Sequence, residues 1–291
     1  MAQQQFNGNY ITATGMDAID PVQSSRLINC SLIAAVASCA WTSKGPWYKN
    51  VGANNEVVAN AYNLQFYDYG KKVPAVNPSS KLPQDPPGNL IYAKSATANE
   101  CWPGIIEKGY YMSRDRILRN IDNDTPDIEY YNDPLVNPTN NPPSVLYHLL
   151  QTEPQKRSNL LNGADYKEGM IWADLKGISL GRVPNYKIRY PAVAYTFDKV
   201  QNTWKTDTIS PKHTYSILGL VDTSTAANPA SKYIVLRDPR GASAEPALPA
   251  PDMLTQGAWL NGINFANRDG IFAIRSDLFP VYFQGYAYSV C

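Results

Sequence analysis

Apolar side chains recur with helical spacing in the first half of the chain. The largely apolar run from Leu27 to Trp41 places Leu32, Ile33 and Val36 at such spacing, which predicts a helix buried along one side. Further helices are predicted at the start of residues 53–69, at 101–117 and from residue 144 onward. The proline-rich residues 71–88 and the Asp/Asn/Pro-rich residues 122–143 predict irregular loops between them.

Segments rich in β-branched and aromatic residues dominate the second half. They occupy residues 187–198, 202–210, 213–222, 232–238, 270–275 and 281–290. Turn-forming residues separate them, so we expect antiparallel strands. Helices followed by strands indicate an α+β fold with a cleft between two parts. The expected division is a helical lobe at residues 1–165 and a β-rich lobe at residues 166–291.

Composition narrows the classes of function. The chain has 26 Lys+Arg residues and 25 Asp+Glu residues, so no overall charge favours nucleic acid or acidic membranes as partners. No apolar run reaches the roughly 18 residues that a membrane-spanning helix needs. The first residues show no secretory pattern, and the four cysteines form no CxxC pair. We therefore expect a cytoplasmic, reduced protein, of unassigned oligomeric state.

Candidate chemistry centres on Cys30, at the start of the first predicted helix. The positive end of a helix dipole favours thiolate over thiol, and Gln23 lies close enough in sequence to donate to an oxyanion. The chain has two histidines. His148 lies amid leucines in a predicted helix, whereas His213 opens a predicted strand. Asp238 ends the next strand and can accept the ring N–H of His213 if the two strands are neighbours.

Each of these residues also has an ordinary structural explanation. Cys30 fits an inert core thiol, His213 fits the end of a turn, and Asp238 before a proline fits a turn start. Their joint order along the two dissimilar halves favours a thiol-dependent site.

Several segments resemble the calpain-type cysteine peptidases. Residues 23–39, QSSRLINCSLIAAVASC, resemble the active-site helix of that family, with Cys30 at the nucleophile position. The segments KHTYSILGL, LRDPRG and DGIFAIRSDLFPVYF resemble the regions of the catalytic histidine, of an Asn-Pro-Trp-Gly turn and of the last strands. The segment CWPGIIEKGYY resembles a family helix, matched at Trp102, Pro103, Glu107, Lys108 and Tyr110.

The resemblance implies a papain-like fold of two lobes, with the active-site cleft between the lobe bearing Cys30 and the lobe bearing His213 and Asp238. It implies a cysteine endopeptidase acting on protein or peptide substrates. The Cys30 thiolate would attack the scissile carbonyl, His213 would protonate the leaving amine, and Asp238 would hold the imidazole. The Cys30 backbone N–H and the Gln23 side chain would stabilise the oxyanion.

The nucleophile segment departs from the family pattern at two places. Gln23 lies seven residues before Cys30 instead of six, and Ser24 stands at the usual glutamine position. Ser31 replaces the tryptophan that usually follows the nucleophile. The aim of the Gln23 side chain is therefore the least secure part of the predicted site.

The histidine partner departs as well. Asp238 replaces the usual asparagine, and Arg240 replaces the tryptophan two residues later. A charged aspartate favours the imidazolium form of His213. The loss of a covering aromatic side chain predicts that the pair of His213 and Asp238 is more exposed to water.

Metal binding is implied only by the resemblance, because calcium aligns the two lobes of calpain cores. We expect no cofactor in the chemistry itself and Ca²⁺ as a candidate activator, with metal ligands unassigned. The acidic residues 122–133 lack the glycine and the final glutamate of an EF-hand loop, so they are interpreted as a solvated loop. Two histidines and no cysteine pair argue against zinc.

Two other functions remain open. The shifted Gln23 and the two replaced tryptophans are compatible with a non-catalytic binding or regulatory module of the same fold. Asp238 also fits a transglutaminase-like acyltransferase, which uses a Cys–His–Asp triad. The family helix around Glu107 and Lys108 favours the peptidase.

Overall fold

The structure is a computed structural model of the chain. None of the helices that it describes is both long enough and apolar enough to cross a membrane. The residues described are 2–5, 17–44, 62–97, 100–122, 124, 127–133, 137, 140–160, 169–205, 209–225, 231–244, 252–254, 257–265 and 269–291.

Helices and strands are both present in this part of the chain, in agreement with the predicted α+β class. The helices are α1 (Cys30–Thr42), α2 (Trp102–Arg119), α3 (Ile128–Asn132), α4 (Pro142–Leu149), α5 (Met170–Gly177) and α6 (Phe279–Tyr282), with 3-10 turns η1 (Gly241–Ala244) and η2 (Leu260–Gly262). The strands are β1 (Ala2–Gln5), β2 (Pro21–Val22), β3 (Tyr67–Asp68), β4 (Lys71–Lys72), β5 (Lys81–Gln84), β6 (Lys94–Ser95), β7 (Gln155–Ser158), β8 (Ser179–Arg182), β9 (Asn185–Ile188), β10 (Ala192–Thr196), β11 (Thr214–Asp222), β12 (Lys232–Arg237), β13 (Met253–Leu254), β14 (Ile271–Arg275) and β15 (Phe283–Tyr288).

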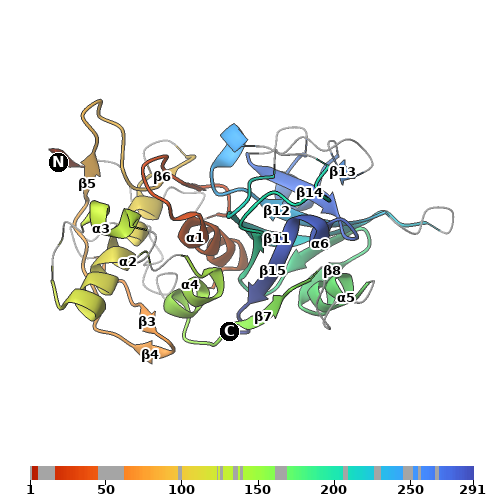
Figure 1. The fold of residues 1–291 in the computed structure, drawn as a ribbon, viewed down its shortest axis with the longest axis horizontal. Helices are drawn as coiled ribbons and strands as arrows, with labels where there is room; N and C mark the ends of the chain where they lie inside the picture. Colours follow the sequence, from red (N-terminus) through yellow and green to blue (C-terminus); the bar gives the residue numbers. More distant parts are fainter. Residues whose placement is uncertain are drawn as a thin grey trace.

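A nine-stranded antiparallel sheet dominates the second half. Its strands follow the order β13-β14-β12-β11-β10-β15-β7, and β9, with β8 beside it, pairs with β11 as well. Strands β11 and β12 run antiparallel, with Ser216 opposite Arg237. The start of β11 and the end of β12 therefore lie side by side, at the same end of these two strands. Figure 1 shows α1 lying between this sheet and helix α2.

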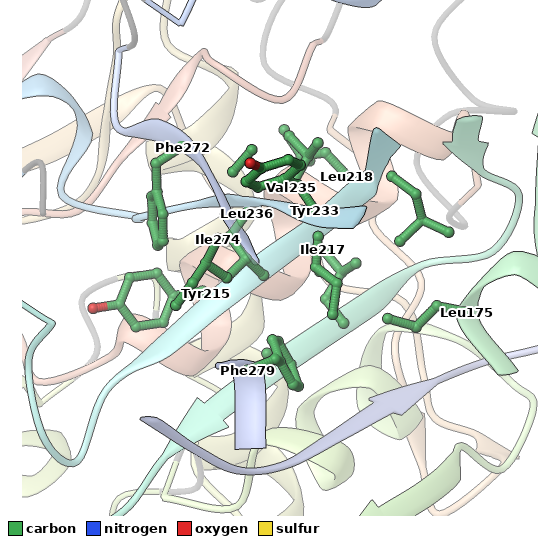
Figure 2. Close-up of a cluster of buried hydrophobic side chains, with 14 of the residues drawn as sticks. Leu175, Tyr215, Ile217, Leu218, Tyr233, Val235, Leu236, Phe272, Ile274 and Phe279 are labelled. Atoms are coloured by element: carbon green, nitrogen blue, oxygen red, sulfur yellow. The ribbon is translucent and has the colours of Figure 1, made fainter. Parts of the chain in front are cut away.

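Two clusters of buried hydrophobic side chains form the core. One gathers α1, α2, α4 and neighbouring loops, and the other fills the sheet with α5 and α6. In the second cluster Ile217, Val235 and Ile274 come from three strands of the sheet, β11, β12 and β14 (Figure 2). Helix α1 is buried at every residue from Ser31 to Trp41, and not along one side as predicted, because both clusters include residues of this helix.

Several predicted elements differ in the structure. The helix predicted at the start of residues 53–69 falls on residues 53–61, which lie outside the described part, and the polar loop expected after it holds a bridge and the short strand β3. The described part of residues 202–210 forms turns instead of a strand, with Trp204 against Tyr282. Strands β4 and β5 and helix α3 occur in the two segments predicted to be irregular. The predicted division at residue 165 lies outside the described residues and stays a prediction.

Candidate active site

Cys30 is the first residue of α1. Its N-cap residue, Asn29, makes no side-chain cap; its amide nitrogen instead donates a hydrogen bond to the Glu107 carboxyl group in the middle of α2. Glu107 also accepts from the backbone N–H of Ala93. The loop that leads into Cys30 is thus attached to a second helix. Asn29 was not singled out by the sequence, although its place one residue before a helix start is a typical capping signal.

Helix α1 is hydrogen-bonded to the sheet along one face. Every contact involves a buried side chain at the junction of the helix with β10 or β11. The pairs are Ser31 Oγ with Thr214 Oγ1 (2.9 Å), Ser216 Oγ donating to the Ala34 carbonyl (2.7 Å), the Ala192 N–H donating to Ser38 Oγ (2.7 Å) and Trp41 Nε1 donating to the Leu218 carbonyl (2.7 Å). Cys30 is thereby held at the end of the sheet where β11 begins.

His213 and Asp238 lie together at this end of the sheet. His213 immediately precedes β11 and Asp238 immediately follows β12, and His213 Nε2 lies 3.0 Å from Asp238 Oδ1. Because a carboxylate only accepts, the imidazole donates this bond. The loop before β11 is held by Thr196, whose Oγ1 accepts from the His213 backbone N–H (2.9 Å). The two side chains lie as close as strand adjacency predicts, and their roles in catalysis stay a prediction.

The prediction that the pair of His213 and Asp238 is more exposed to water is wrong. Asp238 has no solvent-exposed surface and His213 is buried. Arg240 takes the place of a covering aromatic: its Nε donates to Asp238 Oδ1 (3.1 Å) and its Nη2 to Oδ2 (2.7 Å). The guanidinium thus covers the carboxylate and compensates its charge. The sequence signal for this contact is an arginine two residues after an aspartate in a turn.

Electrostatics favour an ion pair between Cys30 and His213. Burial raises the pKa of the Cys30 thiol, but the hydrogen bond and charge of His213 and hydrogen bonds from Thr214 outweigh it and leave the pKa below its ordinary value. Burial lowers the pKa of His213, whereas hydrogen bonds to Asp238 and Cys30 raise it to about 9. Burial raises the pKa of Asp238, and its bonds with His213 and Arg240 bring it down to about 2. This arrangement favours the thiolate, imidazolium and carboxylate forms together.

A pocket of about 340 Å³ opens beside Cys30 and His213. Its lining is mixed, with apolar, amide, hydroxyl and charged side chains from both ends of the fold. Besides these two residues it comprises Ile28, Ser31, Asn140, Asn141, Pro142, Pro143, Lys156, Tyr195, Thr196, Asp198, Lys212, Thr214 and Gln284. The volume is sufficient for a substrate side chain next to the thiol.

Gln23 lies near this centre but is not among the residues that line the pocket. Its Nε2 donates to the Leu27 carbonyl (2.9 Å), and its backbone N–H donates to the Pro239 carbonyl (2.8 Å), beside Asp238. Ser24, at the usual glutamine position, donates through its hydroxyl to the Leu90 carbonyl (3.3 Å). An amide nitrogen has two protons, so the bond to Leu27 leaves Gln23 one further donor.

The remaining candidates have structural roles. His148 is a core residue, 2% exposed, whose Nδ1 lies 2.9 Å from the Tyr110 hydroxyl; burial lowers its pKa to about 3. In the acidic segment, Asp122 pairs with an arginine, Asp124 with a buried lysine, and Asp127 caps α3. Across the residues that the structure describes, no group of three or more His, Cys, Asp or Glu side chains is arranged to hold a metal ion.

A thiol at a helix start, a paired histidine and aspartate and an adjoining pocket are the features of a cysteine-peptidase site. The family model described as calpain family cysteine protease matches residues 3–245. The chain therefore belongs to the calpain family of cysteine proteases, which implies proteins as substrates. A comparison with curated proteins found no match.

Proposed function

We propose that this protein is a cysteine endopeptidase of papain-like, two-lobe architecture, which hydrolyses peptide bonds through Cys30, His213 and Asp238. One observation carries the proposal: Cys30 and His213 come from the two dissimilar halves of the chain and border one pocket, and His213 is hydrogen-bonded to the buried Asp238. A buried pair of this kind beside a thiol suits nucleophilic catalysis.

In the proposed reaction, the Cys30 thiolate forms a bond to the scissile carbonyl carbon, and the C=O π electrons move onto oxygen. The oxyanion is stabilised by the Cys30 backbone N–H, which lies in the first turn of α1 where it has no intrahelical acceptor, and by Gln23. As the C–N bond breaks, the His213 imidazolium gives its proton to the leaving nitrogen. Neutral His213 then takes a proton from water, which attacks the thioester, and the thiolate leaves.

The direct test is cleavage of an unstructured protein by the parent and by Cys30→Ala. We expect the variant to lose activity, whereas Cys291→Ala, which alters an exposed cysteine, serves as the matched control and keeps it. In parallel, a thiol-directed epoxide should label Cys30 with one equivalent at neutral pH. Cleavage by Cys30→Ala at the parent rate would refute the proposal.

The placement of Gln23 favours one alternative, a non-catalytic module of the same fold. If the Gln23 amide donates only to the Leu27 carbonyl, the oxyanion lacks its side-chain donor. Absence of both epoxide labelling and cleavage in folded protein would support this alternative. Acyl transfer, the second alternative, would incorporate an amine into glutamine-containing substrates without releasing new peptide N-termini.

Calcium activation remains a proposal that rests on the family alone. Its test is active-site titration with and without Ca²⁺, together with calorimetry of Ca²⁺ binding to the intact chain. Equal titres and no binding heat would argue that the centre assembles without the ion.

A further inference from the structure

Arg240 holds Asp238 from two directions. Besides its two guanidinium contacts, its backbone N–H donates to Asp238 Oδ1 (2.9 Å). Oδ1 therefore accepts from Arg240 N, Arg240 Nε and His213 Nε2, while Oδ2 accepts from Arg240 Nη2. Both oxygens of this buried carboxylate are engaged, and one of the partners carries a permanent positive charge.

The same guanidinium reaches the segment that carries His213. Arg240 Nη2 donates to Ser210 Oγ (2.8 Å), and the Ser210 carbonyl accepts from Thr196 Oγ1 (2.9 Å). Thr196 in turn accepts from the His213 backbone N–H. Arg240 thus joins the acceptor of the imidazole to the loop that positions the imidazole, and lies half-buried over both.

The charge of Arg240 matters because histidine must change protonation state in a thiol-peptidase cycle, acting first as an acid and then as a base. An uncompensated aspartate beside an imidazole stabilises imidazolium and would oppose the second role. The groups that face His213 are Cys30 from α1, Asp238 at the end of β12, and the ring of Tyr215 in β11, which is perpendicular to the imidazole; the charge of Arg240 lies on the other partner of Asp238. Lys156, Asp198 and Lys212 line the exposed rim of the pocket.

We infer that Arg240 is a positioning residue, which combines with Asp238 into one electrically neutral acceptor for the imidazole of His213. The inference rests on the proposed function. Aspartate and arginine at positions 238 and 240 then form a matched set, in which the guanidinium supplies both the cover and the charge compensation. Arg240 hydrogen-bonds Asp238 and Ser210, and it acts on the imidazole through Asp238.

The test is an NMR titration of ¹³C-labelled histidine in the intact chain. The sequence has two histidines, and His148, with a pKa of about 3, stays neutral above pH 5 and serves as an internal reference. His213 of the parent should titrate near pH 9. Arg240→Gln should raise the midpoint by about one unit, because its Nε and the imidazole Nε2 share one acceptor oxygen and a charge at that range shifts a pKa by about 1–3 units.

Three further variants make the test decisive. Asp238→Asn leaves Arg240 uncompensated and should lower the midpoint, whereas Asp238→Asn with Arg240→Gln restores neutrality and should return it close to the parent value. Arg240→Lys, which keeps the charge, is the conservative control and should leave the midpoint nearly unchanged. It also tests the inference if Arg240→Gln does not fold, because a large shift in the lysine variant refutes a charge role.

No shift in folded Arg240→Gln, or shifts of the same sign in both single variants, would overturn the inference. The titration requires no substrate turnover. Failure of the proposed function therefore appears as absent cleavage with the opposing shifts intact, whereas failure of this inference appears as normal cleavage without them.

Discussion

The side chain of Asn29 donates a hydrogen bond to the carboxylate of Glu107, 78 residues further along the chain. The acceptor is fully buried in α2, and the donor immediately precedes Cys30. The position of the candidate nucleophile therefore depends on a contact between two helices as well as on the start of its own helix.

Asn29→Ala should weaken both stability and reactivity. It removes a donor from a buried acceptor, which typically costs about 1–3 kcal/mol in the free energy of unfolding. We expect a lower melting temperature and slower alkylation of Cys30. The matched control is Asn202→Ala, at an exposed turn, which should stay within about 0.5 kcal/mol of the parent. Unchanged values for both variants would contradict the role given to Asn29.

Glu107 should make stability fall as the pH rises from about 4.5 to about 8. Burial raises its pKa from 4.5 to about 8, against the opposing hydrogen bonds from Ala93 and Asn29. The folded protein thus keeps a proton that the unfolded chain releases near pH 4.5, so the favourable contribution is complete below that pH and is lost as the pH rises to about 8. Glu107→Gln should reduce the fall in unfolding free energy between pH 5 and 8. Urea denaturation at several pH values measures it, and identical slopes in parent and variant would count against the shift.

Cys30 should be the most reactive of the four cysteines at mildly acidic pH. Its pKa is lowered, whereas burial raises the pKa of Cys39, Cys101 and Cys291. Iodoacetamide at pH 6 should therefore add one equivalent, located at Cys30 by peptide mapping. His213→Ala should move this reactivity to alkaline pH, and retention of the parent profile in that variant would disprove the ion pair.

Variants of Gln23 and Ser24 can show which of the two side chains donates to the oxyanion. If Gln23 is an oxyanion donor, Gln23→Ala should lower kcat by about 10²–10³-fold with little change in KM. Ser24→Ala, whose hydroxyl donates to Leu90, should leave kcat nearly unchanged. Steady-state kinetics with circular dichroism as a folding control separate the two, and a parent-like kcat for Gln23→Ala would remove it from the site.

Gly219 in β11 should not tolerate a methyl group. A Cβ there would lie 2.1 Å from the Tyr186 carbonyl oxygen and 2.7 Å from the Trp259 ring, which itself stacks on Trp41 of α1. Gly219→Ala should cost at least about 1–3 kcal/mol of unfolding free energy. Gly177→Ala in α5, where nothing lies within 4 Å, should be neutral or stabilising by up to about 1 kcal/mol. Equal denaturation midpoints would contradict the expected clash.

Local periodicity is enough to predict α1, β11 and β12, because each is buried along nearly its whole length. Strand adjacency then brings His213 to Asp238. The strand predicted at residues 281–290 forms as β15 from Phe283 onward, and only its first two residues differ, because Pro280 in the first turn of α6 favours a helical turn there. The same reasoning fails at residues 202–210 because β-branched residues there lack a strand partner among the described residues.

The finer features of the site depend on contacts that periodicity does not encode. The exposure of an arginine such as Arg240 depends on the side chains that it contacts. Only the tertiary structure places Asp238 and Ser210 within reach of its guanidinium. The direction of the Gln23 amide is likewise decided by the Leu27 carbonyl. A side chain with several donors has several satisfactory partners, so its identity alone does not select one.

The four hydrogen-bonded positions of α1 at the sheet are Ser31, Ala34, Ser38 and Trp41. They lie three or four residues apart and so fall on one helix face. Apolar contacts are non-directional, whereas these bonds each require one angle and one distance. A rotation of the helix about its axis, or a slide by one residue, would break all of them together. The aim of the Cys30 thiol at His213 is therefore set by the rotational register of a helix against a sheet.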